Sequence, residues 1–285
     1  MLEKRLARIN KRTRIKGRKR LYSRLFLYSD LFRETQLFLI DCHKKYCQPH
    51  ANMVYCYKGE MVMKIGSFED MEYVIQYPSG YVEGKRYPVL LFLHGAGTRG
   101  ADIELLKNNV VLPTLLTRGE EFSFIVVAPH CKSGTWFDYF ERLKRFVQSV
   151  FAAPYTDKER LYVLGMSMGG YGTWQLAMSM PTYFAAIVPI CGGGMYWNAG
   201  QLINVPVWAF HGEKDPTVFV EESKKMVSAI NQRGGRARLT LYPEAMHDSW
   251  TATVQNQAVF EWLLSQRNQN SEVAKDELSG NQIYG

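Results

Sequence analysis

The chain is 285 residues long, 46% hydrophobic and 13% aromatic, which is typical of a globular protein with one large domain and a sizeable core. Its net charge of +8 is confined to the first fifth of the sequence: residues 1–60 hold 15 Lys or Arg against 5 Asp or Glu, whereas residues 61–285 hold 20 against 22. The nearly neutral remainder argues against a nucleic-acid-binding face on the globular part.

Residues 1–60 are predicted to be a basic, poorly ordered N-terminal extension. Residues 1–20 carry ten Lys or Arg and one acidic residue. The apolar runs between residues 21 and 40 are interrupted by charges and are too short for a signal-peptide core or a transmembrane segment. A basic amphipathic helix that binds a membrane surface or RNA is the alternative interpretation of this extension.

The cysteines are irregularly spaced and do not define a metal site. They are Cys42, Cys47, Cys56, Cys131 and Cys191. Cys42 and Cys47, with His43 and His50 nearby, resemble a zinc cluster only in part, because a second pair of ligands at the required spacing is missing. We therefore predict no metal and no cofactor, and the simplest location for such a protein is the reducing cytoplasm.

Apolar runs predict a series of strands along the chain. The run 87–93 is apolar throughout, as expected of a strand that is buried on both faces, whereas 72–77 and 238–242 alternate between apolar and polar residues. The predicted strands cover residues 72–77, 87–93, 124–128, a run that starts at Leu161, 185–191, 205–210 and 238–242.

Helices are predicted between these strands. They lie near residues 102–108, 112–118, 140–150, 171–180, 218–232 and 254–266. Strands that alternate with helices predict an α/β fold, a mostly parallel twisted sheet with helices on both faces. We assign residues 61–267 to this domain and residues 268–285 to a polar C-terminal tail that frays from Arg267 onward. A nucleotide-binding fingerprint follows none of the predicted strands, which argues against a dinucleotide or P-loop site.

A serine stands between two glycines directly after one of these strands. Gly165, Ser167 and Gly169 form a G-x-S-x-G pattern with an apolar strand before it and a helix after it. A strand that reverses sharply into a helix forces the residue at the apex into a strained backbone conformation, in which flanking side chains would collide. Glycines remove this collision, so the Ser167 hydroxyl can project above the sheet. The alternative is a glycine-rich turn that contains a serine by chance.

Two backbone segments are candidates for an oxyanion hole beside this serine. The amide of Met168 lies at the start of the helix that follows Ser167. A glycine-rich turn follows the strand 87–93, and the amide of Ala96 or Gly97 in this turn is the expected second donor. The alternative is that the turn only connects a strand to a helix.

A serine hydroxyl is a weak nucleophile at neutral pH and needs an imidazole to accept its proton and a carboxylate to orient that imidazole. Asp215 and His247 follow the last two predicted strands, in the chain order serine, acid, histidine that this kind of turn predicts. Glu213 and Asp248 are weaker candidates for the acid. Glutamate is the less common choice, and Asp248 adjoins the histidine, where geometry seldom lets it orient the same ring.

These motifs together resemble the α/β-hydrolase superfamily. The motifs are His94-Gly95-Ala96-Gly97, Gly165-Met166-Ser167-Met168-Gly169-Gly170, His211-Gly212-Glu213-Lys214-Asp215 and Glu244-Ala245-Met246-His247. More narrowly, residues 71–267 are similar to carboxylesterase and phospholipase-like hydrolases, which are grouped with dienelactone hydrolases and the prolyl oligopeptidase catalytic domain. The resemblance implies Ser167 as the nucleophile, His247 as the base, Asp215 as the acid and the Met168 amide in the oxyanion hole. Dienelactone hydrolases proper use a cysteine where this chain has Ser167.

The resemblance implies a serine esterase that cleaves small-molecule carboxylic esters through an acyl-enzyme on Ser167. A serine peptidase of the prolyl oligopeptidase type is the first alternative, and a non-catalytic binding protein tethered by its basic leader is the second. We expect Trp136 and Trp250 to line the substrate pocket, although Trp136 fits a core position at the start of a helix equally well. The sequence predicts no particular oligomeric state.

Overall fold

The computed structural model describes residues 62–281. The basic extension predicted for residues 1–60 therefore lies outside the described residues, as do Cys42 and Cys47. Within the described range, none of the helices combines the length and the apolar character that a membrane-spanning helix requires.

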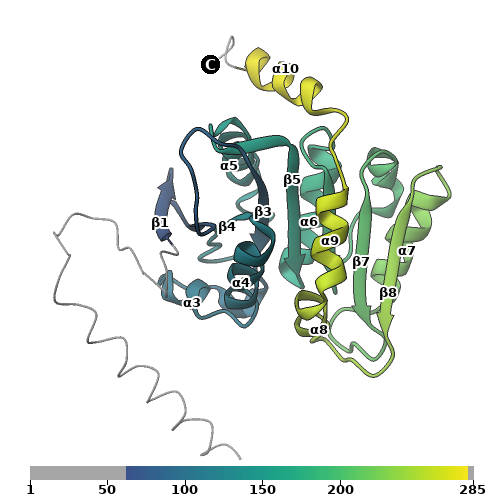
Figure 1. Cartoon of the computed structure of the whole chain (residues 1–285). Helices are drawn as coiled ribbons and strands as arrows, with labels where there is room; N and C mark the ends of the chain where they lie inside the picture. Colours follow the sequence, from purple (N-terminus) through teal and green to yellow (C-terminus); the bar gives the residue numbers. More distant parts are fainter. Residues whose placement is uncertain (1–61, 282–285) are drawn as a thin grey trace, which may run out of the picture. The chain divides into compact units, whose positions relative to one another are not determined.

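A single eight-stranded sheet forms the centre of this part of the chain (Figure 1). Its strands are β1 (Val62–Phe68), β2 (Met71–Tyr77), β3 (Tyr87–Leu93), β4 (Ile125–Pro129), β5 (Thr156–Met166), β6 (Ala186–Ile190), β7 (Val207–Gly212) and β8 (Ala237–Tyr242). Their spatial order is β1-β2-β4-β3-β5-β6-β7-β8. β2 runs antiparallel to both β1 and β4, and all other neighbouring strands are parallel. The predicted mostly parallel sheet is thus confirmed.

Helices cover both faces of the sheet. They are η2 (Ala96–Thr98), α3 (Glu104–Lys107), α4 (Leu112–Phe122), α5 (Phe140–Ala152), α6 (Met168–Ser179), η3 (Tyr196–Leu202), α7 (Glu221–Asn231), α8 (Trp250–Gln255), α9 (Gln257–Ser265) and α10 (Ser271–Asn281). The core residues form two apolar layers, one on each side of the strands. Along β3, Leu91 and Leu93 enter one layer and Leu90 and Phe92 the other. This division explains the continuous apolar run of that strand.

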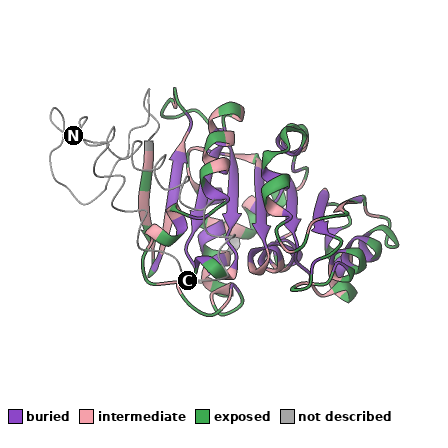
Figure 2. Cartoon of the chain, turned by 90° about the horizontal axis from the view of Figure 1, so that it is seen from below, coloured by how far each residue is buried: buried purple, intermediate pink, exposed green. Residues whose placement is uncertain are grey.

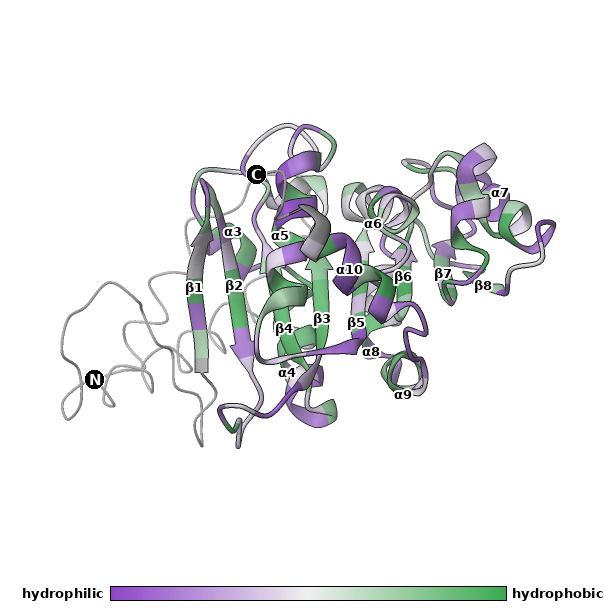
Figure 3. Ribbon diagram, turned by 90° about the horizontal axis from the view of Figure 1, so that it is seen from above, coloured by the Kyte–Doolittle hydropathy of each residue, from purple (hydrophilic) through white to green (hydrophobic). Residues whose placement is uncertain are grey.

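Two further views show the buried strands and the helices that cover them. Figure 2 shows the central strands as buried and much of the helical surface as exposed. Figure 3 shows hydrophobic residues along β3 and β4 and more hydrophilic residues on the outer helices. Because the parallel strands all end at the same edge of the sheet, the residues that follow β3, β5, β7 and β8 are brought together there.

Three of the differences between the structure and the predicted elements have a clear physical cause. Strand β1 is not predicted from the sequence, because Gly66 interrupts its pattern; a side chain at Gly66 would overlap the ring of Tyr73 on the paired strand. The single helix predicted for 254–266 is two helices, α8 and α9. The side chain of Asn256 separates them and accepts a hydrogen bond from the amide of Ala258 at the start of α9.

The third difference is the C-terminal segment, for which the sequence predicts fraying from Arg267. The structure instead continues into helix α10. The amide of Asn268 donates to the carbonyl of Glu159, and Ala274 on α10 is completely buried. The prediction missed this helix because two apolar contacts, Ala274 and Leu278, are enough to dock an otherwise polar segment on the core.

Candidate active site

Ser167 lies at the apex of the turn between β5 and α6. Its backbone has φ 53° and ψ −117°, a strained conformation for a residue with a side chain. The Ser167 amide donates to the carbonyl of Ile190, which fixes the turn against β6. Side chains at Gly165 and Gly169 would overlap the carbonyl of Gly169 and the carbonyl of Leu93, respectively. The glycines therefore allow the close approach of β5, α6 and β3 that holds the serine in place.

A chain of two hydrogen bonds joins Ser167, His247 and Asp215. The Ser167 Oγ lies 2.9 Å from Nε2 of His247, and Nδ1 of the same ring lies 2.7 Å from Oδ2 of Asp215. In the tautomer that this arrangement favours, Nδ1–H donates to the carboxylate and Nε2 accepts from the serine hydroxyl. The structure thus brings together residues that follow β5, β7 and β8. In this geometry the imidazole can take up the serine proton.

The Asp215 carboxylate is buried and fully hydrogen-bonded. Its Oδ1 accepts from the amides of Thr217 and Val218, at 2.8 and 3.0 Å. Burial raises the pKa of Asp215, but the hydrogen bonds from His247 and from these two amides outweigh burial and lower the pKa below its usual value of 3.8. Asp215 is therefore ionised at neutral pH, with its carboxylate beside Nδ1 of His247.

His211 holds the loop that carries this carboxylate. Its Nε2 lies 2.9 Å from the carbonyl of Val218 and 3.3 Å from Oδ2 of Asp215, and its Nδ1 lies 2.7 Å from the hydroxyl of Ser223. The ring is fully buried, and burial lowers the pKa of His211. His211 therefore connects the loop after β7 to helix α7.

The two other acids considered in the sequence lie elsewhere. Asp248 accepts hydrogen bonds from the amide and the hydroxyl of Thr251, both at 3.0 Å, and so caps helix α8. Glu213 is exposed, and its amide pairs with the carbonyl of Tyr242. Neither carboxylate is placed to orient the ring of His247.

Three backbone amides near Ser167 have no acceptor among the described residues. They belong to Met168, the first residue of α6, and to Ala96 and Gly97 of η2. A Cβ added at Gly95 would lie 3.6 Å from Cβ of Ser167, so the turn that leads to Ala96 passes directly beside the serine. Donors on both sides of a nucleophile are the arrangement that binds a developing oxyanion.

A cavity of about 610 Å³ opens beside Ser167 and His247. Leu105, Val110 and Trp250 contribute apolar walls, and the ring of Trp250 meets that of His247 edge to face at 5.2 Å. Trp250 was predicted at this position. Leu105 and Val110 were not predicted, because their exposure at the cavity depends on tertiary packing that the sequence does not show.

Trp136 does not line this cavity, so its prediction as a pocket residue is wrong. Its side chain is completely buried, and Nε1 donates to the carbonyl of His94 at 2.9 Å. The indole packs against Gly172 of α6, where a Cβ would lie 3.2 Å from it. Trp136 is a core residue at the start of a helical segment, and it packs against α6. This was the alternative interpretation of Trp136 in the sequence.

His94 holds together the turn that carries Ala96. Its Nε2 accepts from the amide of Cys131 at 3.0 Å, and its Nδ1 lies 2.8 Å from the carbonyl of Gly95. Burial lowers the pKa of His94 to about 4, which keeps the ring neutral at physiological pH. The ring therefore fixes η2 relative to the end of β4.

One group of side chains near the serine has donor atoms that could hold a metal ion. Cys191, Asp215 and His247 place one such atom each within 4.8 Å of one another. Asp215 and His247 are already bonded to each other, and burial raises the pKa of the Cys191 thiol to about 12. Because Asp215 and His247 belong to the hydrogen-bonded chain with Ser167, that chain accounts for their proximity.

Comparisons with known proteins find one matching family and several similar solved structures. The model of the dienelactone hydrolase family matches residues 110–272. A thermostable esterase of known structure superposes with a TM-score of 0.64 and 31% identity, over 73% of this chain and 63% of that chain.

Two curated relatives are more distant. "Probable feruloyl esterase C" of Aspergillus terreus is 25% identical over 169 residues, which are 58% of this chain and 62% of the relative. Dipeptidyl-peptidase 5 of Porphyromonas gingivalis is 21% identical in an alignment of 234 positions that covers 64% of this chain and 33% of the relative. The chain thus spans less than two thirds of the length of each of these proteins.

Proposed function

Because the chain belongs to the dienelactone hydrolase family, we propose that it hydrolyses carboxylic esters through an acyl-enzyme on Ser167. The observation that carries this proposal is the hydrogen-bonded chain from Ser167 through His247 to the ionised Asp215. An array of this kind, beside unpaired backbone amides, also argues against a purely non-catalytic binding protein.

The proposed reaction has two halves. In the first, His247 accepts the Ser167 proton, Oγ attacks the ester carbonyl, and the amides of Met168 and Ala96 bind the oxyanion. His247 then gives the proton to the departing alkoxide, and the alcohol leaves. In the second half, His247 takes a proton from water, the resulting hydroxide attacks the acyl-enzyme, and the proton returns to Ser167 as the acid leaves.

We propose that the part of the substrate that lies beside Ser167 is an aromatic or aliphatic group. The cavity walls from Leu105, Val110 and Trp250 are apolar, and 610 Å³ lies within the usual range for small-molecule sites. The similarity to a feruloyl esterase supports an aromatic acyl group in particular. A small-molecule ester of this kind needs no cofactor.

A peptidase is the second candidate, favoured by the similarity to dipeptidyl-peptidase 5. Amide hydrolysis requires protonation of a poorer leaving group and an anchor for the peptide terminus. Glu104 is the one carboxylate that lines the cavity in the described part of the chain, and it already forms an ion pair with Lys107. This pairing makes Glu104 a weak anchor for a peptide ammonium and supports the esterase proposal.

A comparison of ester and amide substrates with the same acyl group tests this choice. The same preparation is assayed with nitrophenyl esters of aromatic and aliphatic acids and with the matching nitroanilides. We expect steady-state turnover of the esters and none above background for the amides. Amide turnover clearly above background would instead support the peptidase, because only a peptidase expels the poorer amine leaving group.

Replacement of Ala96 by Pro tests the oxyanion hole. Ala96 is the first residue of η2, and Gly95 before it has an extended backbone, so proline fits this position while removing the amide hydrogen. We expect kcat to fall by about 10²- to 10³-fold. A kcat equal to that of the unmodified chain would show that the amide of Ala96 does not contribute to the oxyanion hole.

The cytoplasmic location and the limits of the catalytic domain are also proposals. Cys131 and Cys191, the cysteines in the described part of the chain, are buried and unpaired, which is compatible with the predicted cytoplasmic location. Residues 61–267 are proposed as the catalytic domain. If residues 1–60 are an appendage, their deletion leaves ester turnover unchanged.

A further inference from the structure

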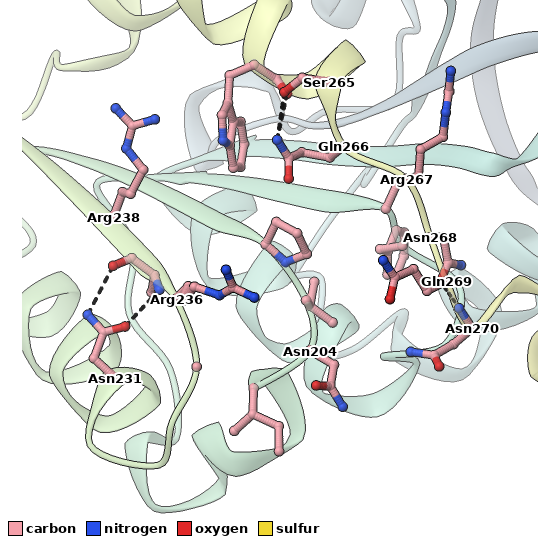
Figure 4. Close-up of a pocket in the computed structure, with 18 residues that line it drawn as sticks. Asn204, Asn231, Arg236, Arg238, Ser265, Gln266, Arg267, Asn268, Gln269 and Asn270 are labelled. Atoms are coloured by element: carbon pink, nitrogen blue, oxygen red, sulfur yellow. Dashed lines mark hydrogen bonds between the residues drawn. The ribbon is translucent and has the colours of Figure 1, made fainter.

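A second cavity, of about 1050 Å³, lies at the opposite end of the sheet from Ser167. Figure 4 shows this cavity in close-up. Residues just before β6 and β7, the start of β8 and the segment between α9 and α10 line it. We call it the amino-end cavity, because the parallel strands begin there. Strand β7 has six residues, so about 20 Å separates the amino-end cavity from the carboxyl ends of the strands. It shares no residue with the cavity beside Ser167.

The amino-end cavity is positively charged. Of the 18 residues that line it, three are arginines (Arg236, Arg238 and Arg267) and none is Asp or Glu. The structure shows neither an ion pair nor a hydrogen bond for the side chains of Arg236 and Arg267 within residues 62–281. The Arg238 guanidinium lies 3.9 Å from the centre of the Trp208 ring, a cation–π contact that fixes its position. Unpaired guanidinium groups in a concave surface attract anions such as carboxylates and phosphates.

Amide side chains add hydrogen-bonding groups to this cavity. Asn231 fixes the cavity wall at Ala237: its side-chain nitrogen donates to the carbonyl of Ala237, and its side-chain oxygen accepts from the amide of Ala237. Asn204, Gln269 and Asn270 have side chains without a hydrogen-bond partner in the described part of the protein. Figure 4 shows Arg236 extending toward the middle of the cavity, with Asn204 and Gln269 on the other side. Groups that both donate and accept suit hydroxyl-rich ligands.

An indole provides an apolar surface in the same cavity. Trp262 is partly exposed there, and its ring meets that of Trp208 edge to face at 5.4 Å, which fixes its orientation. A rigid aromatic face beside amides and guanidinium groups matches a sugar ring, which has an apolar C–H face and a polar rim. The volume accommodates several such rings and far exceeds the need of a single inorganic anion.

We propose that the amino-end cavity binds an acidic oligosaccharide. Its carboxylates pair with Arg236 and Arg267, its hydroxyls bond to the amides of Asn204, Gln269 and Asn270, and one ring packs on Trp262. Because the amino-end cavity is distant from Ser167, the oligosaccharide binds there without competing with an ester substrate. The binding is independent of the proposed esterase function and is measured without any turnover.

Calorimetric titration of the full chain tests this proposal. The probes are a trimer of galacturonic acid, the same trimer with its carboxyl groups reduced to alcohols, and sodium phosphate. The variants are Arg236→Gln and, as a matched control, Arg86→Gln, which removes one exposed arginine from the loop between β2 and β3. Both positions are exposed, and a thermal unfolding measurement on each variant checks that it is folded.

We expect the acidic trimer to bind, the reduced trimer and phosphate to bind at least tenfold more weakly, and the affinity for the acidic trimer to fall with added salt. Arg236→Gln should raise the Kd for the acidic trimer about tenfold or more, while Arg86→Gln leaves it unchanged. The proposal is overturned if the acidic trimer does not bind, if the reduced trimer binds equally well, if phosphate binds as tightly, or if Arg236→Gln has no effect.

Discussion

Replacement of Ser167 by Ala is expected to lower kcat for a nitrophenyl ester by about 10⁴- to 10⁶-fold. The Ser167 Oγ is the one hydroxyl within hydrogen-bond distance of Nε2 of His247 in the described residues, at 2.9 Å. Without it no acyl-enzyme forms, and the oxyanion donors and the cavity alone provide the residual rate. Stopped assays at high enzyme concentration measure a reduction of this size.

The matched control is Ser179→Ala, at the exposed end of the same helix α6. It should retain the kcat and KM of the unmodified chain, because its hydroxyl bonds only to the side chain of Gln175. If Ser167→Ala kept more than a tenth of the original kcat while remaining folded, another residue would have to be the nucleophile.

Replacement of Asp215 by Asn is expected to lower kcat by about 10⁴-fold with little change in KM. An asparagine fills the same volume but carries no negative charge, so it neither stabilises the imidazolium nor fixes the proton on Nδ1 of His247. The amides of Thr217 and Val218 still have an oxygen to bind, so the loop should keep its conformation. Steady-state kinetics on the ester separate this loss of kcat from a loss of binding.

Glu213→Gln is the control for this variant. Glu213 is two residues away in the same loop but is exposed and makes no contact with His247, so its neutralisation should leave kcat within twofold of the original. A larger loss of kcat in Glu213→Gln than in Asp215→Asn would reassign the acid and contradict the geometry described above.

The positions of Ser167, Asp215 and His247 at one edge of the sheet could be predicted because local rules determine them. Gly165 and Gly169 mark a sharp strand-to-helix turn whatever the rest of the fold does. The acid and the histidine each follow an apolar strand, and parallel strands end at a common edge. Their catalytic roles stay predictions until the variants are measured.

The cavity walls could not be predicted in the same way, because they depend on tertiary packing. Trp136 and Trp250 look alike in sequence, each an aromatic residue near the start of a helical segment after a strand. The first is buried against Gly172, whereas the second faces His247. Helix α3 is only four residues long, too short for a periodic pattern to identify the wall that Leu105 contributes.

The amino-end cavity also could not be predicted from the sequence. Arg236 and Arg267 are 31 positions apart, and each follows a helix as an ordinary polar residue. The pairing of β8 with β7 and the continuation of the chain past α9 bring them to one cavity. Helix α10 was missed for the same reason, since its docking rests on a few long-range contacts.

Active-site labelling tests the central claim most directly. The full chain is treated with a fluorophosphonate, digested, and mapped by mass spectrometry. The account predicts one covalent adduct per chain, on Ser167, with labelling lost in Ser167→Ala and strongly slowed in His247→Ala. Ester turnover with no adduct, or an adduct on a different residue, would contradict it.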